Sequence, residues 1–168
     1  MSTVKRVGGT FHIRFAKEDF KFSSAHFTLF SATAAEALHG HNYRVWLELG
    51  GGKLSPRGLL VEFDPLKRAV RTLCADLDGR VLLPARAAGL SLREEGGDLE
   101  VLWRDRVYRF PTDEVVRLPL ANTSIELLAQ YLWERLVDTA AETGCETLGV
   151  GVEETSGQSC YFESDIPR

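Results

Sequence analysis

Alternation of apolar and polar side chains through the first fifty residues constrains this chain most strongly, because a period of two is typical of a β-strand. The alternating positions are Phe11, Ile13, Phe15, Phe20, Phe22, Ser24 and His26. The pattern changes phase near Glu18–Asp19, which predicts one long strand with a bend or bulge at that point. A second strand is expected from about Tyr43 to Leu49, ended by Gly50-Gly51-Gly52.

Two helices are expected further along the chain. In the first, Asp64 is predicted as N-cap, Pro65 as the first helical residue and Gly79 as the left-handed residue that ends it. The second begins near Thr123, whose spacing to Glu126 is that of a capping box. Their apolar stripes comprise Leu66, Ala69, Val70, Leu73 and Leu77 in the first helix and Leu128, Tyr131, Leu132 and Leu136 in the second.

The remaining periodic segments predict more strands. Residues 97–110 are expected to form a hairpin that turns at Arg104-Asp105, and a last pair of strands is expected over about Thr147–Glu154 and Ser159–Glu163. The order is strand, strand, helix, hairpin, helix, strand, strand. It predicts one α+β domain over residues 1–168, with helices on one face of an antiparallel sheet.

Composition excludes some classes of function. The net charge of −4 argues against a nucleic-acid partner, and no apolar run is long enough to span a bilayer, so no membrane association is expected. The three cysteines, Cys74, Cys145 and Cys160, lack the spacing of a disulfide framework or a zinc-binding pair. They indicate reduced thiols and a cytoplasmic protein.

Three of the four histidines lie in the first quarter of the chain: His26, His39 and His41. In an extended segment, the two imidazoles of His39-Gly40-His41 point to the same side, and His26 at the end of the preceding strand can add a third nitrogen. Three histidines with an open position are typical of catalytic zinc. The alternative is three polar side chains near strand ends. His12, on the polar phase of its strand, is assigned no role.

The residues around these histidines resemble a known family. Phe22-Ser23-Ser24-Ala25-His26-Phe27 and Leu38-His39-Gly40-His41-Asn42-Tyr43 are similar to the paired signature of the 6-pyruvoyl-tetrahydropterin synthases and the related 6-carboxytetrahydropterin synthases. Three later segments agree in order: residues 61–67, where Glu62 replaces the usual aspartate, residues 122–126, and residues 152–155. The resemblance covers nearly the whole chain except the hairpin near 97–110.

The resemblance implies the tunnelling fold, in which subunits of four antiparallel strands and two helices join their sheets into an oligomeric barrel. It implies a homohexamer, a dimer of trimers, with zinc held by His26, His39 and His41. It also implies a pterin-like ligand, dihydroneopterin triphosphate in most members, bound in a pocket between subunits.

Glu154 stands at the family's pterin-anchoring position. It also continues the apolar face of Leu148, Val150 and Val152, and a carboxylate there needs partners such as the adjacent N–H donors of a pterin. The alternatives are a solvated strand end or an ion pair with Arg44. Ser124 matches a family hydroxyl near the pterin. Helix capping is its other interpretation, and one hydroxyl can serve both.

Two catalytic groups of the family are missing from this chain. Its synthases use a cysteine base that corresponds to Ala35, assisted by an aspartate–histidine pair that corresponds to Asp78-Gly79. Glu36, in Glu36-Ala37-Leu38-His39, resembles a family variant that uses glutamate as base and cleaves the side chain of dihydroneopterin triphosphate. The alternative is a solvated glutamate in a mobile loop.

These features leave three functions open. The leading expectation is a pterin-binding homologue whose lyase reaction is lost or altered. The second is an active glutamate-variant enzyme that forms 6-hydroxymethyl-dihydropterin, with Glu36 and Asp78 as catalytic groups. The third is a structural or regulatory oligomer without catalysis.

Overall fold

The computed structural model describes residues 8–167. In this range the elements follow one another as β1 (Phe11–His26), β2 (His39–Gly51), α1 (Asp64–Leu77), β3 (Arg80–Pro84), β4 (Leu90–Glu95), β5 (Asp98–Trp103), β6 (Arg106–Pro111), the 3-10 turn η1 (Thr112–Glu114), β7 (Val115–Leu118), α2 (Ile125–Glu142), β8 (Thr147–Thr155) and β9 (Gln158–Asp165). The architecture is α+β, as the sequence predicts.

The main sheet has six strands in the order β7-β3-β1-β2-β8-β9. The expected antiparallel core of β1, β2, β8 and β9 is present, with the predicted bulge in β1 between Ala16 and Lys21. The expectation of a purely antiparallel, four-stranded sheet is wrong, because β3 pairs in parallel with β1 and with β7. The Gly79 N–H donates to the Ser23 carbonyl, so the chain leaving α1 is brought alongside the end of β1.

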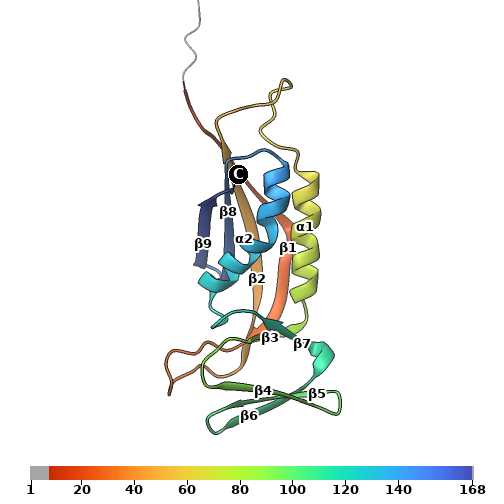
Figure 1. Cartoon of the computed structure of the whole chain (residues 1–168), viewed down its shortest axis with the longest axis vertical. Coiled ribbons are helices and arrows are strands. Elements are labelled where there is room, and N and C mark those ends of the chain that lie inside the picture. Colours follow the sequence, from red (N-terminus) through yellow and green to blue (C-terminus); the bar gives the residue numbers. More distant parts are fainter. Residues whose placement is uncertain (1–7, 168) are drawn as a thin grey trace, which may run out of the picture.

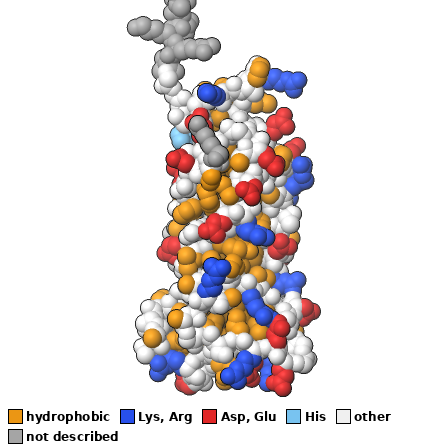
Figure 2. Space-filling view, viewed as in Figure 1, with side chains coloured by type: hydrophobic (Ala, Val, Ile, Leu, Met, Phe, Trp, Pro, Cys, Tyr) orange, Lys and Arg blue, Asp and Glu red, His pale blue; other side chains and the backbone are white. Residues whose placement is uncertain are grey.

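Both helices lie side by side on one face of this sheet (Figure 1). Each turns its apolar stripe inward, and the buried positions are Leu66, Val70, Cys74 and Leu77 in α1 and Leu128, Ala129, Leu132, Leu136 and Ala140 in α2. On the outer surface of the same face, acidic and basic side chains are interspersed (Figure 2). No helix among residues 8–167 is long and apolar enough to cross a bilayer.

The helix ends differ in part from the predictions. The N-cap of α1 is Phe63, and Asp64 is instead the first helical residue, its carboxylate 2.9 Å from the Lys67 ammonium. Gly79 has a φ of +68°, as predicted for the residue after the helix. At α2 the capping box is wrong, because the Thr123 hydroxyl donates to the Phe27 carbonyl at 2.9 Å and Ser124 is the N-cap residue.

A second, three-stranded sheet of β4, β5 and β6 lies at one end of the molecule (Figure 1). The predicted hairpin corresponds to β5 and β6, with its turn at Arg104-Asp105, but β4 was not expected. Its sequence, Leu-Ser-Leu-Arg-Glu-Glu, alternates too briefly to be distinguished from a loop. A second, smaller hydrophobic core lies beneath this sheet. It comprises Leu99 and Val101 of β5, Leu83 of β3, and Phe27 at the start of the loop after β1.

All three cysteines are free thiols, as expected, and Cys74 and Cys145 are buried. Burial raises the pKa of Cys74 to about 12, with smaller contributions from Asp19 and Asp78. Because the thiol is buried and stays protonated at neutral pH, Cys74 is core packing rather than a nucleophile.

Candidate metal centre

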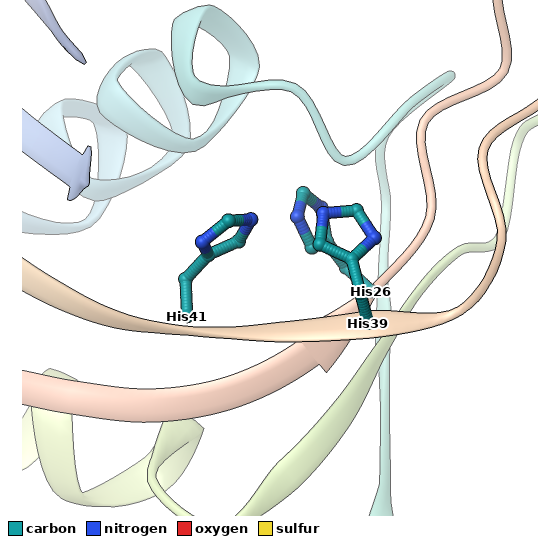
Figure 3. A group of neighbouring side chains, drawn as sticks. All are labelled: His26, His39 and His41. Carbon is teal, nitrogen blue, oxygen red and sulfur yellow. The ribbon is translucent and has the colours of Figure 1, made fainter.

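The end of β1 and the start of β2 bring three histidines together. His26 and His39 are direct partners in the β1–β2 ladder, and His41 lies two residues further along β2 on the same face. One ring nitrogen from each lies within 4.8 Å of the others, and the three rings face a common space (Figure 3). The predicted convergence is therefore present in the folded chain.

Backbone carbonyls orient two of these rings. Nδ1 of His26 lies 2.9 Å from the Thr123 carbonyl, and Nδ1 of His39 lies 2.8 Å from the Ala37 carbonyl. A carbonyl only accepts, so each Nδ1 carries a proton, and in the neutral ring this leaves the lone pair on Nε2. Metal-binding histidines are commonly held in this way by an outer hydrogen bond.

The buried Nε2 of His26 is the clearest sign that the site fits a cation. This atom has no hydrogen-bond partner among the described residues, although Oε1 of Glu154 lies only 3.1 Å away. Burial lowers the pKa of His26, against the Thr123 hydrogen bond and the Glu154 charge, and so favours the neutral ring. A lone pair then faces a carboxylate oxygen, a repulsive arrangement that a metal ion would relieve.

The Glu154 carboxylate lies beside two of these histidines, His26 and His41. Its Oε1 lies 3.6 Å from Nε2 of His41 and accepts a hydrogen bond from the Tyr43 hydroxyl at 3.2 Å, while its Oε2 accepts one from Gln158 at 3.0 Å. The alternatives of a fully solvated carboxylate and of a pair with Arg44 do not describe this geometry. Its side chain is 10% exposed, so the carboxylate can be reached from outside.

Tyr43 is a site residue that the sequence identifies only as the start of the second strand and as the end of the HGHNY segment. Burial and then the Glu154 carboxylate raise the pKa of Tyr43 far above its ordinary value, so the hydroxyl remains a donor to Glu154. The sequence could have indicated this role, because residues 39, 41 and 43 alternate along β2 and therefore share one face of the strand.

A pocket of about 440 Å³ opens beside β2 and β8 and gives access to Glu154 and His41. Its lining is mainly polar and comprises Gly40, His41, Asn42, Arg44, Glu153, Glu154, Thr155 and Ser156. The volume is in the range of small-molecule sites, and a flat ring with several N–H groups would find an acceptor in the Glu154 carboxylate.

Glu36 is fixed at the end of the ladder that carries His26 and His39. Its Oε2 accepts the Thr28 N–H at 3.0 Å, and its own N–H donates to the Thr28 carbonyl at 2.9 Å. Burial raises the pKa of Glu36, but the Thr28 hydrogen bonds and the nearby His39 and His26 outweigh it, so the pKa lies below its ordinary value. Glu36 is thus a half-buried, ionised carboxylate with defined partners, not a solvated side chain.

Asp78 and Ser124 are placed differently. The exposed Asp78 carboxylate accepts the Ser23 N–H at 2.7 Å, which supports the backbone where α1 meets β1. The half-buried Ser124 hydroxyl makes no capping bond to α2 and remains available to a ligand. The catalytic role of Asp78 and the ligand role of Ser124 stay predictions.

Comparisons with known proteins find one family. The model of the 6-pyruvoyl tetrahydropterin synthase family matches residues 15–165. The 6-carboxy-5,6,7,8-tetrahydropterin synthase of Bacillus subtilis is 33% identical over 86% of this chain and 82% of its own. A Methanocaldococcus jannaschii protein provisionally given the same name is 28% identical over 84% of this chain and 88% of its own.

Among solved structures, the 6-pyruvoyl tetrahydropterin synthase of Plasmodium vivax superposes with a TM-score of 0.87 at 27% identity, covering 94% of this chain and 99% of that one. A variant of that enzyme, described as a catalytic residue mutant in which alanine replaces a glutamate, superposes with a TM-score of 0.86. A glutamate is therefore a catalytic residue in a protein of closely similar fold.

Proposed function

The chain belongs to the 6-pyruvoyl tetrahydropterin synthase family, and on that basis we propose that it cleaves the side chain of dihydroneopterin triphosphate, with Glu36 as the base. The observation that carries this proposal is the Glu36 carboxylate, held by Thr28 at the end of the strands that bear His26 and His39. The product is 6-hydroxymethyl-dihydropterin.

This function is the second of the three expected from the sequence, and the comparisons favour it over an inactive pterin binder. The relatives bear the names of pterin-converting enzymes, and one similar fold uses a catalytic glutamate. The absent cysteine, at Ala35, then marks a change of base, whereas the absent histidine, at Gly79, leaves Asp78 without the partner that the family's pair provides.

The residues of this chain suit the reaction. His26, His39 and His41 would hold a zinc ion, which when bound supplies Lewis-acid polarisation of the side-chain oxygens. Glu36 takes the proton from the side-chain hydroxyl whose carbon becomes a carbonyl as the carbon–carbon bond breaks. The electron pair of that bond passes into the conjugated pterin, and the ring-side carbon is then reprotonated. Glu154 binds the pterin N–H groups, and the free Ser124 hydroxyl assists.

Incubation of the zinc-loaded protein with dihydroneopterin triphosphate, followed by mass analysis of the products, tests this function. We expect 6-hydroxymethyl-dihydropterin and a two-carbon aldehyde triphosphate. The product 6-carboxytetrahydropterin would assign the chain to the reaction named for the Bacillus subtilis relative. Substrate that binds but is not converted would favour the first expected function, a pterin-binding homologue without lyase activity. Formation of 6-pyruvoyl-tetrahydropterin would refute the assignment of Glu36 as the base.

Replacement of Glu154 by glutamine is expected to weaken pterin binding by about 1.5–3 kcal/mol, since a hydrogen bond to a charged group contributes about that much. The exposed Gln158 amide would give way to the pterin, whereas Tyr43 would keep its bond to the remaining oxygen. Fluorescence titration with a pterin measures the change. Glu134→Gln, on α2 and outside the pocket lining, is the control, and equal affinities in the two variants would remove Glu154 from the binding site.

The proposed pocket lies between subunits of a homohexamer, built as a dimer of trimers. Two strand edges support this assembly: among the described residues, β9 pairs only with β8, and β1 before Ser24 pairs only with β2. Both edges carry exposed apolar side chains, with Phe11 49% and Tyr161 40% exposed, and such edges are commonly covered by another chain. Light scattering is expected to give six times the 18.7 kDa chain mass, and a stable monomer at micromolar concentration would reject the assembly.

A further inference from the structure

The loop that joins β1 to β2 carries Glu36 but has few side chains that could hold it in place. Leu29 and Leu38 pack against the core of the small sheet at its two ends. Between them, residues 31–35 read Ser-Ala-Thr-Ala-Ala, and Phe30 is 67% exposed. Anchorage of the middle of this loop must therefore act through its backbone.

Two arginines beside the β5–β6 turn supply that anchorage. Arg106 donates from Nη1 to the Glu36 carbonyl and from Nη2 to the Ala35 carbonyl at 3.3 Å. Arg104 donates to the Ala32 carbonyl at 3.4 Å. The fork of one guanidinium thus spans two successive peptide units, one of which belongs to the proposed base.

Arg106 is itself held in place. It is half-buried, and its guanidinium lies 5.3 Å from the centre of the Trp103 ring, which is only 4% exposed. Trp103 and Arg106 are direct partners across the turn, where Arg104 has a φ of +56°, uncommon for a residue with a side chain. The small sheet therefore presents its arginines to the loop from a defined position.

We propose that Arg106 is a positioning residue that fixes residues 35–36 and so sets the Glu36 carboxylate against the substrate. This inference rests on the proposed function. It also assigns a purpose to the sheet of β4, β5 and β6, which holds the backbone of the base-bearing loop while Thr28 holds the Glu36 carboxylate. A general base acts only within a narrow range of positions, and a displacement of about 1 Å can lower the rate about a hundredfold.

The first test replaces Arg106 with glutamine in the zinc-loaded protein and uses dihydroneopterin triphosphate as substrate. We expect kcat to fall about ten- to a hundredfold, with KM and zinc content changed less than about twofold, because binding groups are untouched. Arg109→Gln is the matched control, since Arg109 lies on the same strand but pairs with Glu100 at 3.3 Å. A fall in kcat that is equal in both variants would refute positioning through Arg106.

The second test does not depend on activity. Hydrogen exchange at the Glu36 and Thr28 amides reports the two bonds that tie the base to the strand end. Arg106→Gln is expected to accelerate exchange at both amides at least about tenfold, while Arg109→Gln leaves it unchanged. Arg106→Lys keeps the charge but cannot span both carbonyls, so its exchange rates should lie between those of Arg106→Gln and Arg109→Gln. It also provides a folded variant if the glutamine disrupts the small sheet. Unchanged exchange in both Arg106 variants would overturn the proposal.

A double variant separates this inference from the proposed function. If Arg106 acts through Glu36, Arg106→Gln should lower kcat no further in a Glu36→Gln background. A further loss in that background would contradict the proposal. If Glu36→Gln alone leaves activity intact, the proposed function fails. Faster exchange in Arg106→Gln would then still establish that Arg106 holds the loop.

Discussion

Replacement of Glu36 by glutamine is expected to lower the turnover of dihydroneopterin triphosphate by about a hundred- to ten-thousandfold, the usual contribution of a positioned general base. The amide has nearly the same shape as the carboxylate but cannot take a proton. Its oxygen can still accept the Thr28 N–H, so the loop should keep its structure. The expected loss therefore appears in kcat, with binding of the pterin ring largely preserved.

Mass-detected product formation under saturating substrate measures this effect. Glu134→Gln is the control, because Glu134 lies on α2 and, among residues 8–167, its carboxylate pairs only with the neighbouring Gln130. Turnover near that of the unaltered protein in Glu36→Gln would exclude Glu36 as the base. Loss of turnover together with loss of pterin affinity would instead point to damage of the pocket.

Replacement of His39 by alanine is expected to reduce bound zinc from about one ion per chain to almost none, because three nitrogen ligands are the smallest set usual for catalytic zinc. His39 is the best probe of the three, since its ring is partly exposed, whereas His26 is 1% exposed and its loss would also leave a cavity. Activity should fall with the metal.

Metal analysis after dialysis against dilute zinc decides this prediction. His12→Ala is the control, because that exposed histidine lies near the other end of the β1–β2 ladder, opposite Gly50. Full zinc content in His39→Ala would show that the ion does not bind among these histidines. Retained activity in a zinc-free variant would remove the metal from the proposed reaction.

The long elements were predictable because each has a strong period of its own. The alternation in β1 and β2 and the apolar stripes of α1 and α2 identified these elements and their buried faces. The short strands β3 and β7 were missed because their residues do not alternate, and β4 was missed because it alternates over only its first four residues. Their pairing depends on tertiary structure, because α1 and the small sheet determine which strand each of them lies beside.

Part of the candidate site was also predictable from the sequence. Spacing alone placed His39 and His41 on one side of a strand and Glu154 on the buried face of another, because side-chain direction within a strand follows from residue parity. Identity of the residues also showed that Ala35 and Gly79 cannot act as base or partner.

Only the tertiary structure decided which partners surround those side chains. The bonds from His26 to the Thr123 carbonyl and from Arg106 to the Glu36 carbonyl join residues 97 and 70 positions apart. Their acceptors are backbone oxygens, which every residue possesses and which therefore leave no mark in a sequence. A period specifies the direction of a side chain within its own element, whereas the contact it makes across elements depends on the strand register and loop path that the whole fold sets.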